Sequence, residues 1–267
     1  MANWQSTLIA GASFAILAAC GQAKTADTEP AAEPEAFAAV DTNRISTASA
    51  GDEWLTYGGT YDEQRHSSLI EVNTETVSDL GVAWTYDLAT NRGVESTPIV
   101  VDGVMYVTSA WSLVYALDAK TGETRWVWSY NEGARGEAAP RKNHRGVAYW
   151  ADGSEERIVY ITPGYNLISL DARTGRPDPR FGLEGVVDLF DGLDRPRPRP
   201  GAIGSTSPPI IVKDVVVVGS AQPAFAPSKE NIAGFVRGYD VKTGERRWIF
   251  HTIPVAGEFG NDTWEED

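Results

Sequence analysis

The chain of 267 residues contains a single cysteine, Cys20, so no intrachain disulfide can form. Basic residues are scarce as well: 23 lysines and arginines stand against 37 aspartates and glutamates, which gives a formal net charge of −14. Nucleic-acid binding needs basic patches that displace counterions, so this balance argues against a nucleic-acid partner. It also argues against electrostatic docking on anionic lipid, and a solvated acidic surface is the simpler explanation of the surplus.

The apolar run near the N-terminus, residues 8–19, is too short to cross a bilayer, which takes roughly 20 residues. Its length suits the apolar region of a secretory signal, and small residues lead directly to Cys20. The arrangement resembles a bacterial lipoprotein signal, although residues 1–7 carry no lysine or arginine. We expect residues 1–19 to be a signal peptide and Cys20 to carry lipid; a plain signal peptide or a buried helix is the alternative.

Lipidation of Cys20 would place the protein in the cell envelope, facing the periplasm and attached to the membrane through the lipid anchor only. Gly21 stands where inner-membrane lipoproteins often have aspartate, which favours the outer membrane. Residues 20–51 are rich in alanine, proline, glutamate and threonine and predict a disordered acidic tether. The folded part is therefore expected at residues 52–267.

The folded part begins with a strand-turn signal at Trp54–Thr60, which is followed by a strand signal at Val82–Tyr86. Further along, the β-branched runs Ile99–Val101 and Val104–Val107 flank Asp102-Gly103, a pair that strongly predicts a hairpin. A third run, Leu113–Leu117, then leads through an Asp-x-x-Thr-Gly turn to a final run rich in tryptophan. This order predicts an antiparallel meander.

The same unit of strand, strand, Asp-x-x-Thr-Gly turn and strand occurs three times, with the aspartate of the turn at Asp118, Asp171 and Asp240. A small sheet with two apolar faces must stack on neighbouring sheets, so the repetition predicts a β-propeller. A tryptophan that follows the turn, such as Trp126, is expected to pack between sheets. The second copy has no such tryptophan, and Phe181 is expected to replace it.

The pattern Ala-x-Asp-x-x-Thr-Gly-x-x-x-Trp at Ala116–Trp126 resembles the tryptophan-docking repeat of quinoprotein dehydrogenases, which use pyrroloquinoline quinone (PQQ). Glu95–Pro98, His144–Val147 and Phe250–Glu258 are similar to segments of that family in the same order. The resemblance covers residues 52–267 and implies an all-β, eight-bladed propeller with the cofactor on its axis. Only about the first three to four blades fit in this length, so we expect a fragment of a longer protein, inactive alone; a complete, smaller propeller is the alternative.

The resemblance also implies cofactor-binding residues. Glu95 matches a glutamate beside PQQ, and Arg145 matches an arginine that pairs with a PQQ carboxylate. Thr206 and Ser220 match small hydroxyl donors near the ends of strands. Each has a simpler alternative as an ordinary surface residue, and His144 is expected at the surface. Ca²⁺ or another divalent cation is implied, but its ligands, the general base and the stacking tryptophan are expected beyond residue 267.

Two departures from the family narrow the subclass. The vicinal cysteine pair of methanol- and ethanol-type enzymes is missing before Arg145, and the metal-ligating glutamate is missing after Ser220. Both departures make the chain more similar to the membrane glucose dehydrogenase branch. Phosphate-binding glycine loops, zinc-ligand spacings and nucleophile elbows are also missing.

The sequence therefore predicts a quinoprotein dehydrogenase that oxidises an aldose or other alcohol. Its electrons are expected to pass to ubiquinone or to cytochrome c in the respiratory chain. The alternative is a non-enzymatic propeller lipoprotein, resembling the scaffold subunit of outer-membrane β-barrel assembly. That family binds protein rather than a cofactor, whereas the long insertions 129–157 and 176–204 favour the enzyme.

Overall fold

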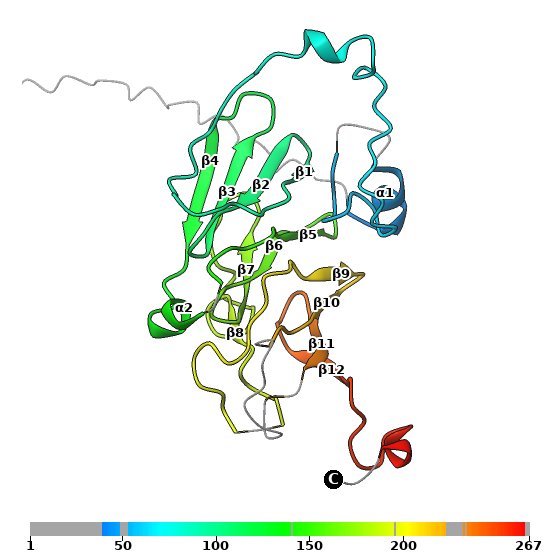
Figure 1. Cartoon of the computed structure of the whole chain (residues 1–267), viewed down its shortest axis with the longest axis vertical. Coiled ribbons are helices and arrows are strands. Elements are labelled where there is room, and N and C mark those ends of the chain that lie inside the picture. The colour runs from blue at the N-terminus through cyan, green and yellow to red at the C-terminus, as the bar shows by residue number, and fades with distance from the viewer. Residues whose placement is uncertain are drawn as a thin grey trace, which may run out of the picture. The chain divides into compact units, whose positions relative to one another are not determined.

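The computed structural model describes residues 39–48, 53–139, 141–194, 196–222, 232 and 234–264. Three four-stranded antiparallel sheets follow one another along this part of the chain (Figure 1). Each sheet uses strands in sequence order, which is the arrangement of a propeller blade. The structure therefore confirms the all-β prediction and shows three blades within the described residues.

The first blade confirms the predicted meander. Its strands are β1 (Ile99–Val101), β2 (Val104–Thr108), β3 (Leu113–Asp118) and β4 (Thr124–Ser129). Asp102 and Gly103 connect β1 to β2 with φ of 47° and 75°. Positive φ at both positions is what a two-residue hairpin turn requires, so this pair sets the register in which Ile99 faces Tyr106.

The second and third blades repeat the first. The second contains β5 (Ala148–Ala151), β6 (Glu156–Ile161), β7 (Asn166–Asp171) and β8 (Val186–Asp188). The third contains β9 (Ile210–Val212), β10 (Val215–Val218), β11 (Phe235–Asp240) and β12 (Arg246–His251). The short elements outside the blades are α1 (Thr42–Thr47), α2 (Ala134–Ala138) and the 3₁₀ turns η2 (Val77–Asp79) and η3 (Asn261–Thr263).

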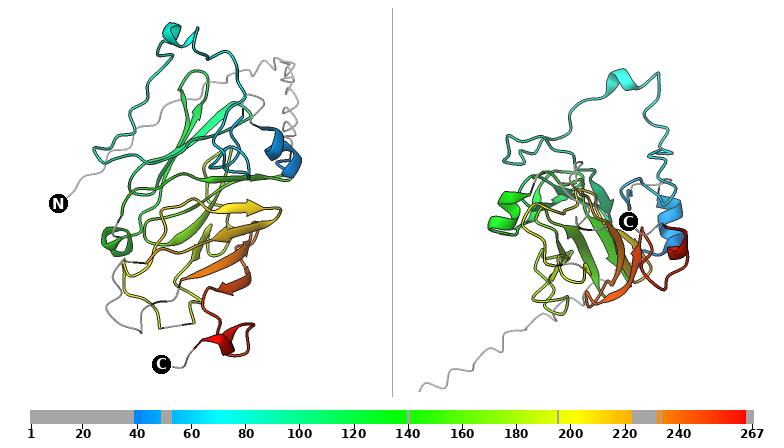
Figure 2. Two further views of the ribbon diagram at one scale, coloured as in Figure 1. Left: turned by 45° about the vertical axis from the view of Figure 1, so that its right-hand side comes forward. Right: turned by 60° about the horizontal axis from the view of Figure 1, so that its bottom comes forward.

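Strand β6 shows why these sheets must stack. Its residues alternate between two hydrophobic clusters: Ile158 and Tyr160 pack with the first blade, while Val159 and Ile161 pack with the third. All four side chains are buried. Because successive side chains of a strand point to opposite faces, a continuous apolar run indicates a sheet that is covered on both faces. Two views of the ribbon show the second blade between the other two (Figure 2).

A tryptophan joins each of the first two Asp-x-x-Thr-Gly turns to the preceding segment. The indole of Trp126, in β4, donates a hydrogen bond to Ala172 O at 2.8 Å and lies on Gly175. A Cβ at position 175 would lie 2.5 Å from the indole ring, and the φ of Gly175 is 67°. Both the close contact and the positive φ favour glycine over any other residue in this turn. Trp84 makes the same contact with Gly122 of the first blade.

Among the described residues, no tryptophan docks on the third turn, which contains Gly244. Phe181 packs there instead, which confirms the expected replacement. A Cβ on Gly244 would meet Val187 Cγ2 at 2.6 Å and Phe181 Cε1 at 3.3 Å. Gly182 N also donates to Thr243 O at 2.8 Å. Phe181 and Val187 together therefore fill the place that one indole fills at the other two turns.

Two predictions for the N-terminal part differ from the structure. Residues 82–86 are not a strand among the described residues, because no neighbouring backbone pairs with them, although Trp84 docks as expected. The segment predicted as a disordered tether ends in helix α1. Asp41 caps that helix by accepting from Arg44 N at 2.8 Å, and Ile45 is only 6% exposed in the core of the first two blades. The buried side chain of Ile45 and the Asp41 cap therefore hold this short polar segment in a helix.

Candidate functional site

All four candidate residues lie at one end of the blades. The first strand of each blade starts at the end where its second strand finishes, because the two are antiparallel. Glu95, Arg145 and Thr206 precede β1, β5 and β9, and Ser220 follows β10. The Asp-x-x-Thr-Gly turns lie at the opposite end, so the site and the blade-docking contacts are separated by the length of the strands.

Backbone hydrogen bonds align the first three residues side by side. Thr97 N donates to Arg145 O at 2.9 Å, and Arg145 N donates to Thr206 O at 3.0 Å. Gly146 allows this approach: its φ is 138°, and a Cβ there would lie 2.9 Å from Thr97 O. The chain thus places an acid, a guanidinium and a hydroxyl on three successive blades at one edge.

The side chains of Glu95 and Arg145 face each other loosely. Arg145 Nε lies 3.7 Å from Glu95 Oε2, and the two side chains are 39% and 41% exposed. An exposed pair at this distance contributes about 0–1 kcal/mol, so little free energy is lost when a ligand takes over either partner. Asn143 Nδ2 donates to Glu95 Oε1 at 3.1 Å and fixes the carboxylate from the other side.

A hollow of about 520 Å³ opens beside these residues. Its lining combines guanidinium and hydroxyl groups with small residues: Arg141, Arg145, Pro163, Gly201, Ile203, Gly204, Ser205, Thr206, Ser207, Ala221 and Gln222. This volume is within the range of ligand pockets, about 300–1,000 Å³. A larger hollow of about 1010 Å³ includes Trp128, Tyr130 and Arg246, and none of the four candidate residues lines it.

Ser220 lies next to this hollow rather than in its lining. Its hydroxyl donates to Phe235 O at 3.5 Å, and the neighbouring Gly219 O accepts from the Tyr165 hydroxyl at 3.0 Å. The structure therefore brings Glu95, Arg145 and Thr206 together and holds Ser220 one residue away from Ala221 in the wall.

His144 was expected at the surface, and the structure shows it buried, with 2% of its area exposed. Its Nδ1 accepts from Gly146 N at 3.2 Å, and its ring meets Tyr160 edge-on. Burial lowers the pKa of His144 to about 4, because the charged imidazolium would lose its hydration. The neutral ring therefore supports the Arg145 loop from inside.

The pKa of His144 predicts an acid-sensitive fold. The unfolded chain takes up a proton near pH 6.5 and the folded chain only near 4, so folding stability is lost as the pH falls between these values. The loss is at most about 3 kcal/mol. Urea unfolding of the wild type and of His144→Gln across this window measures it. A wild-type slope with pH no steeper than that of His144→Gln would contradict the assignment.

Asn143 is the residue of this site that the sequence did not single out. Its role depends on a contact with Glu95, which is 48 positions away. Only the packing of the first two blades against each other brings these two residues together. No pattern of residues along the chain predicts this contact. The preceding position in the sequence, Lys142, also contributes to this end of the molecule through its contact with an exposed tryptophan.

Cys20 lies outside the described residues, so its lipidation stays a prediction. Within the described part of the chain, no group of three or more histidine, cysteine and acidic residues could hold a metal ion. No helix of that part has the length and apolar character to cross a bilayer.

The donor set fits an organic anion. The guanidinium of Arg145 can form paired hydrogen bonds with a carboxylate, and the hydroxyl of Thr206 can donate another. Glu95 stays available as an acceptor because its partners, Asn143 and Arg145, leave it 41% exposed. A ligand that carries carboxylates together with a ring N–H or hydroxyl group matches these donors and acceptors.

Comparison with known proteins agrees with this geometry. Residues 54–267 match the family model of the PQQ glucose/ethanol/alcohol dehydrogenase beta-propeller domain. The dehydrogenase subunit of the quinone alcohol dehydrogenase of Gluconobacter oxydans is 38% identical over 84% of this chain and 28% of its own length. The quinohemoprotein alcohol dehydrogenase of Comamonas testosteroni is 35% identical over 90% of this chain and 32% of its own length.

A solved structure gives the same result. Quinohemoprotein alcohol dehydrogenase ADHIIG of Pseudomonas putida superposes with a TM-score of 0.65 at 35% identity, over 81% of this chain and 29% of that one. The chain thus spans about a third of the length of the relatives that it matches. Because this family model covers residues 54–267, the chain belongs to the PQQ glucose/ethanol/alcohol dehydrogenase beta-propeller family.

Proposed function

We propose that this chain forms part of a quinoprotein dehydrogenase that oxidises an alcohol with PQQ. The observation that carries the proposal is the alignment of Glu95, Arg145 and Thr206 across three blades beside a hollow of about 520 Å³. Family membership supports it, because the matched domain is the PQQ propeller. The finer choice between an aldose and a simple alcohol stays open to experiment; the relatives above are named alcohol dehydrogenases.

The residues of this chain would bind and orient the cofactor. When bound, PQQ supplies the quinone that accepts the two electrons and the hydrogen of the alcohol carbon. Arg145 would hold a carboxylate of the cofactor, and Thr206 would donate a hydrogen bond to it. Glu95, which Asn143 orients, would accept from an N–H of the cofactor. Gly146 keeps the backbone close enough for the three side chains to act on one ligand.

The remaining predictions accompany this proposal. A divalent cation such as Ca²⁺ would assist PQQ, with ligands outside the described residues. Electrons would leave to ubiquinone or cytochrome c, and Cys20 would attach the protein to the envelope. The sequence signal at Cys20 supports the anchor, and relatives named alcohol dehydrogenase (quinone) and 1-butanol dehydrogenase (cytochrome c) support the two electron acceptors. The scaffold lipoprotein remains the competing explanation if no cofactor binds.

Reconstitution tests the proposal. The full-length protein, as its own cells make it, is loaded with PQQ and Ca²⁺ and assayed by dye reduction with glucose, ethanol and a series of polyols. We expect turnover that depends on PQQ, and the preferred substrate identifies the branch of the family. Absence of both PQQ binding and turnover would overturn the proposal and favour the scaffold alternative.

A further inference from the structure

An exposed tryptophan next to the candidate site has two cations on its ring. Trp111 lies in the turn between β2 and β3, at the same end of the blade as Glu95, and is 44% exposed. Arg92 Cζ lies 4.8 Å from the centre of its ring and Lys142 Nζ lies 5.2 Å from it. Arg92 is three positions before Glu95, and Lys142 is three positions before Arg145. The aromatic residue is thus held between the two loops that carry the site.

The backbone at this turn is strained. Trp111 and Ser112 both have positive φ, 65° and 62°, which bulky residues rarely adopt. Trp111 N donates to Lys142 O at 3.3 Å, and the Ser112 hydroxyl donates to Glu132 Oε2 at 3.2 Å. Strain of this kind costs of the order of 1–3 kcal/mol per residue, and it persists where the surrounding structure imposes it, often at functional sites.

The charge of this cluster contrasts with the rest of the protein. Most described arginines pair with a carboxylate; Arg125, Arg180 and Arg247 are examples. Arg92 forms no ion pair with any described residue, in a chain with a net charge of −14. Among the described residues, Lys142 donates to the carbonyls of Gly136 and Glu137 and pairs with no carboxylate. Burial and the charge of Arg92 lower the pKa of Lys142, and the carboxylates of Glu137 and Glu132 offset this effect only in part.

The position of the cluster separates it from the proposed cofactor contacts. None of Arg92, Trp111 and Lys142 lines the hollow that contains Arg145 and Thr206. The cluster is linked to Glu95 through the chain, because Lys142 precedes Asn143, whose amide donates to the Glu95 carboxylate at 3.1 Å. A molecule that approaches the cofactor past this edge would meet an unpaired guanidinium and an indole surface.

We propose that Arg92, Trp111 and Lys142 recognise the carboxylate of the substrate, so that the enzyme prefers a hydroxy acid to the matching neutral polyol. Arg92 binds the carboxylate, Trp111 holds the guanidinium in place, and Lys142 adds positive charge from a fixed position. This proposal rests on the proposed function and specifies its substrate class.

The test compares two six-carbon substrates that differ in a carboxylate, gluconate and glucitol. Replacing Arg92 with glutamine is expected to lower kcat/KM for gluconate about ten-fold, mainly through KM, since charge-assisted hydrogen bonds contribute on this scale. Activity with glucitol should stay within about two-fold. Arg65→Gln is the matched control, because Arg65 also stacks on an aromatic ring, that of Tyr57 at 4.2 Å. Equal losses for both substrates, or a preference of the wild type for glucitol, would overturn the proposal.

A second variant separates recognition from folding. Trp111→Gly removes the ring but relieves the positive φ, so the thermal midpoint should be kept or raised while gluconate affinity falls. Calorimetric titration of gluconate into the cofactor-free protein reads this affinity without turnover. A loss of turnover with every alcohol would count against the proposed function alone. Unchanged gluconate binding in both Arg92→Gln and Trp111→Gly would overturn the recognition site whatever the enzyme does.

Discussion

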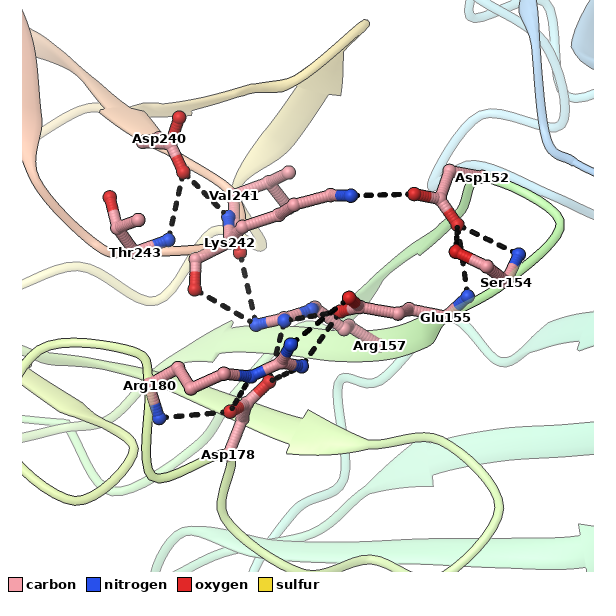
Figure 3. Close-up of polar contacts among 10 residues, drawn as sticks. All are labelled: Asp152, Ser154, Glu155, Arg157, Asp178, Arg180, Asp240, Val241, Lys242 and Thr243. Atoms are coloured by element: carbon pink, nitrogen blue, oxygen red, sulfur yellow. Dashed lines mark hydrogen bonds and ion pairs between the residues drawn. The ribbon is translucent and has the colours of Figure 1, made fainter.

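Replacing Arg157 with methionine is expected to lower the free energy of unfolding by about 3–5 kcal/mol. The guanidinium is buried and joins the second blade to the third (Figure 3). It pairs with Glu155 at 2.6 Å and with Asp178 at 2.5 Å, and it donates to Lys242 O at 3.2 Å in the turn of the third blade. Its removal would leave these acceptors without their buried donor.

The surrounding charges explain why the cluster tolerates burial. Burial alone would raise the pKa of Asp178, but hydrogen bonds from Arg180 and the charge of Arg157 outweigh it and hold the pKa below its ordinary value. Arg180 also contacts Glu155, yet its side chain is 63% exposed. Arg180→Gln is therefore the matched control and should cost less than about 1 kcal/mol in denaturant unfolding. Similar losses for the two variants would contradict the role given to Arg157.

Truncating Trp126 to alanine is expected to lower the free energy of unfolding by up to about 3–5 kcal/mol, the range for large aromatic residues in cores, because this partly buried ring packs against the core of the first two blades. The indole covers Gly175 and bonds to Ala172 O in the next blade, so its loss opens a gap that the rigid turn cannot close. Trp126→Phe should cost less, because the ring is kept and only the hydrogen bond is lost.

Urea or guanidinium unfolding measures these losses. Trp264→Ala is the control, because that side chain is 53% exposed after η3, and its removal should change stability by about 0.5 kcal/mol or less. A small effect of Trp126→Ala, equal to that of Trp264→Ala, would mean that the indole is not the contact that joins the first two blades.

The blades could be predicted from the sequence because their signals are local. Asp102-Gly103 demands positive φ, and the three Asp-x-x-Thr-Gly turns each use the aspartate to accept from the backbone two and three residues on, as Asp171 does from Arg173 N and Thr174 N. Residues 82–86 have the same strand-like composition but lack a pairing partner among the described residues. Composition alone therefore does not distinguish a strand from an extended segment that docks by one tryptophan.

The site could be predicted only in part, and through family resemblance. Glu95, Arg145 and Thr206 lie in matching positions before the first strands, so their convergence follows from the repeat. Asn143 and Trp111 act across distant loops, and the burial of His144 depends on packing with Tyr160. Such contacts arise from the way the blades pack against one another, and no local sequence pattern predicts that packing.

The central claim is that Arg145 binds a carboxylate of PQQ, and an equilibrium titration of PQQ tests it most directly. The full-length protein, as its own cells make it, is compared with Arg145→Gln and with Arg180→Gln, which alters the opposite end of the blade. We predict that Arg145→Gln raises the Kd about 100-fold, in line with the loss of a hydrogen-bonded charge pair, and that Arg180→Gln leaves it unchanged. A Kd for Arg145→Gln equal to that of the wild type would contradict the account.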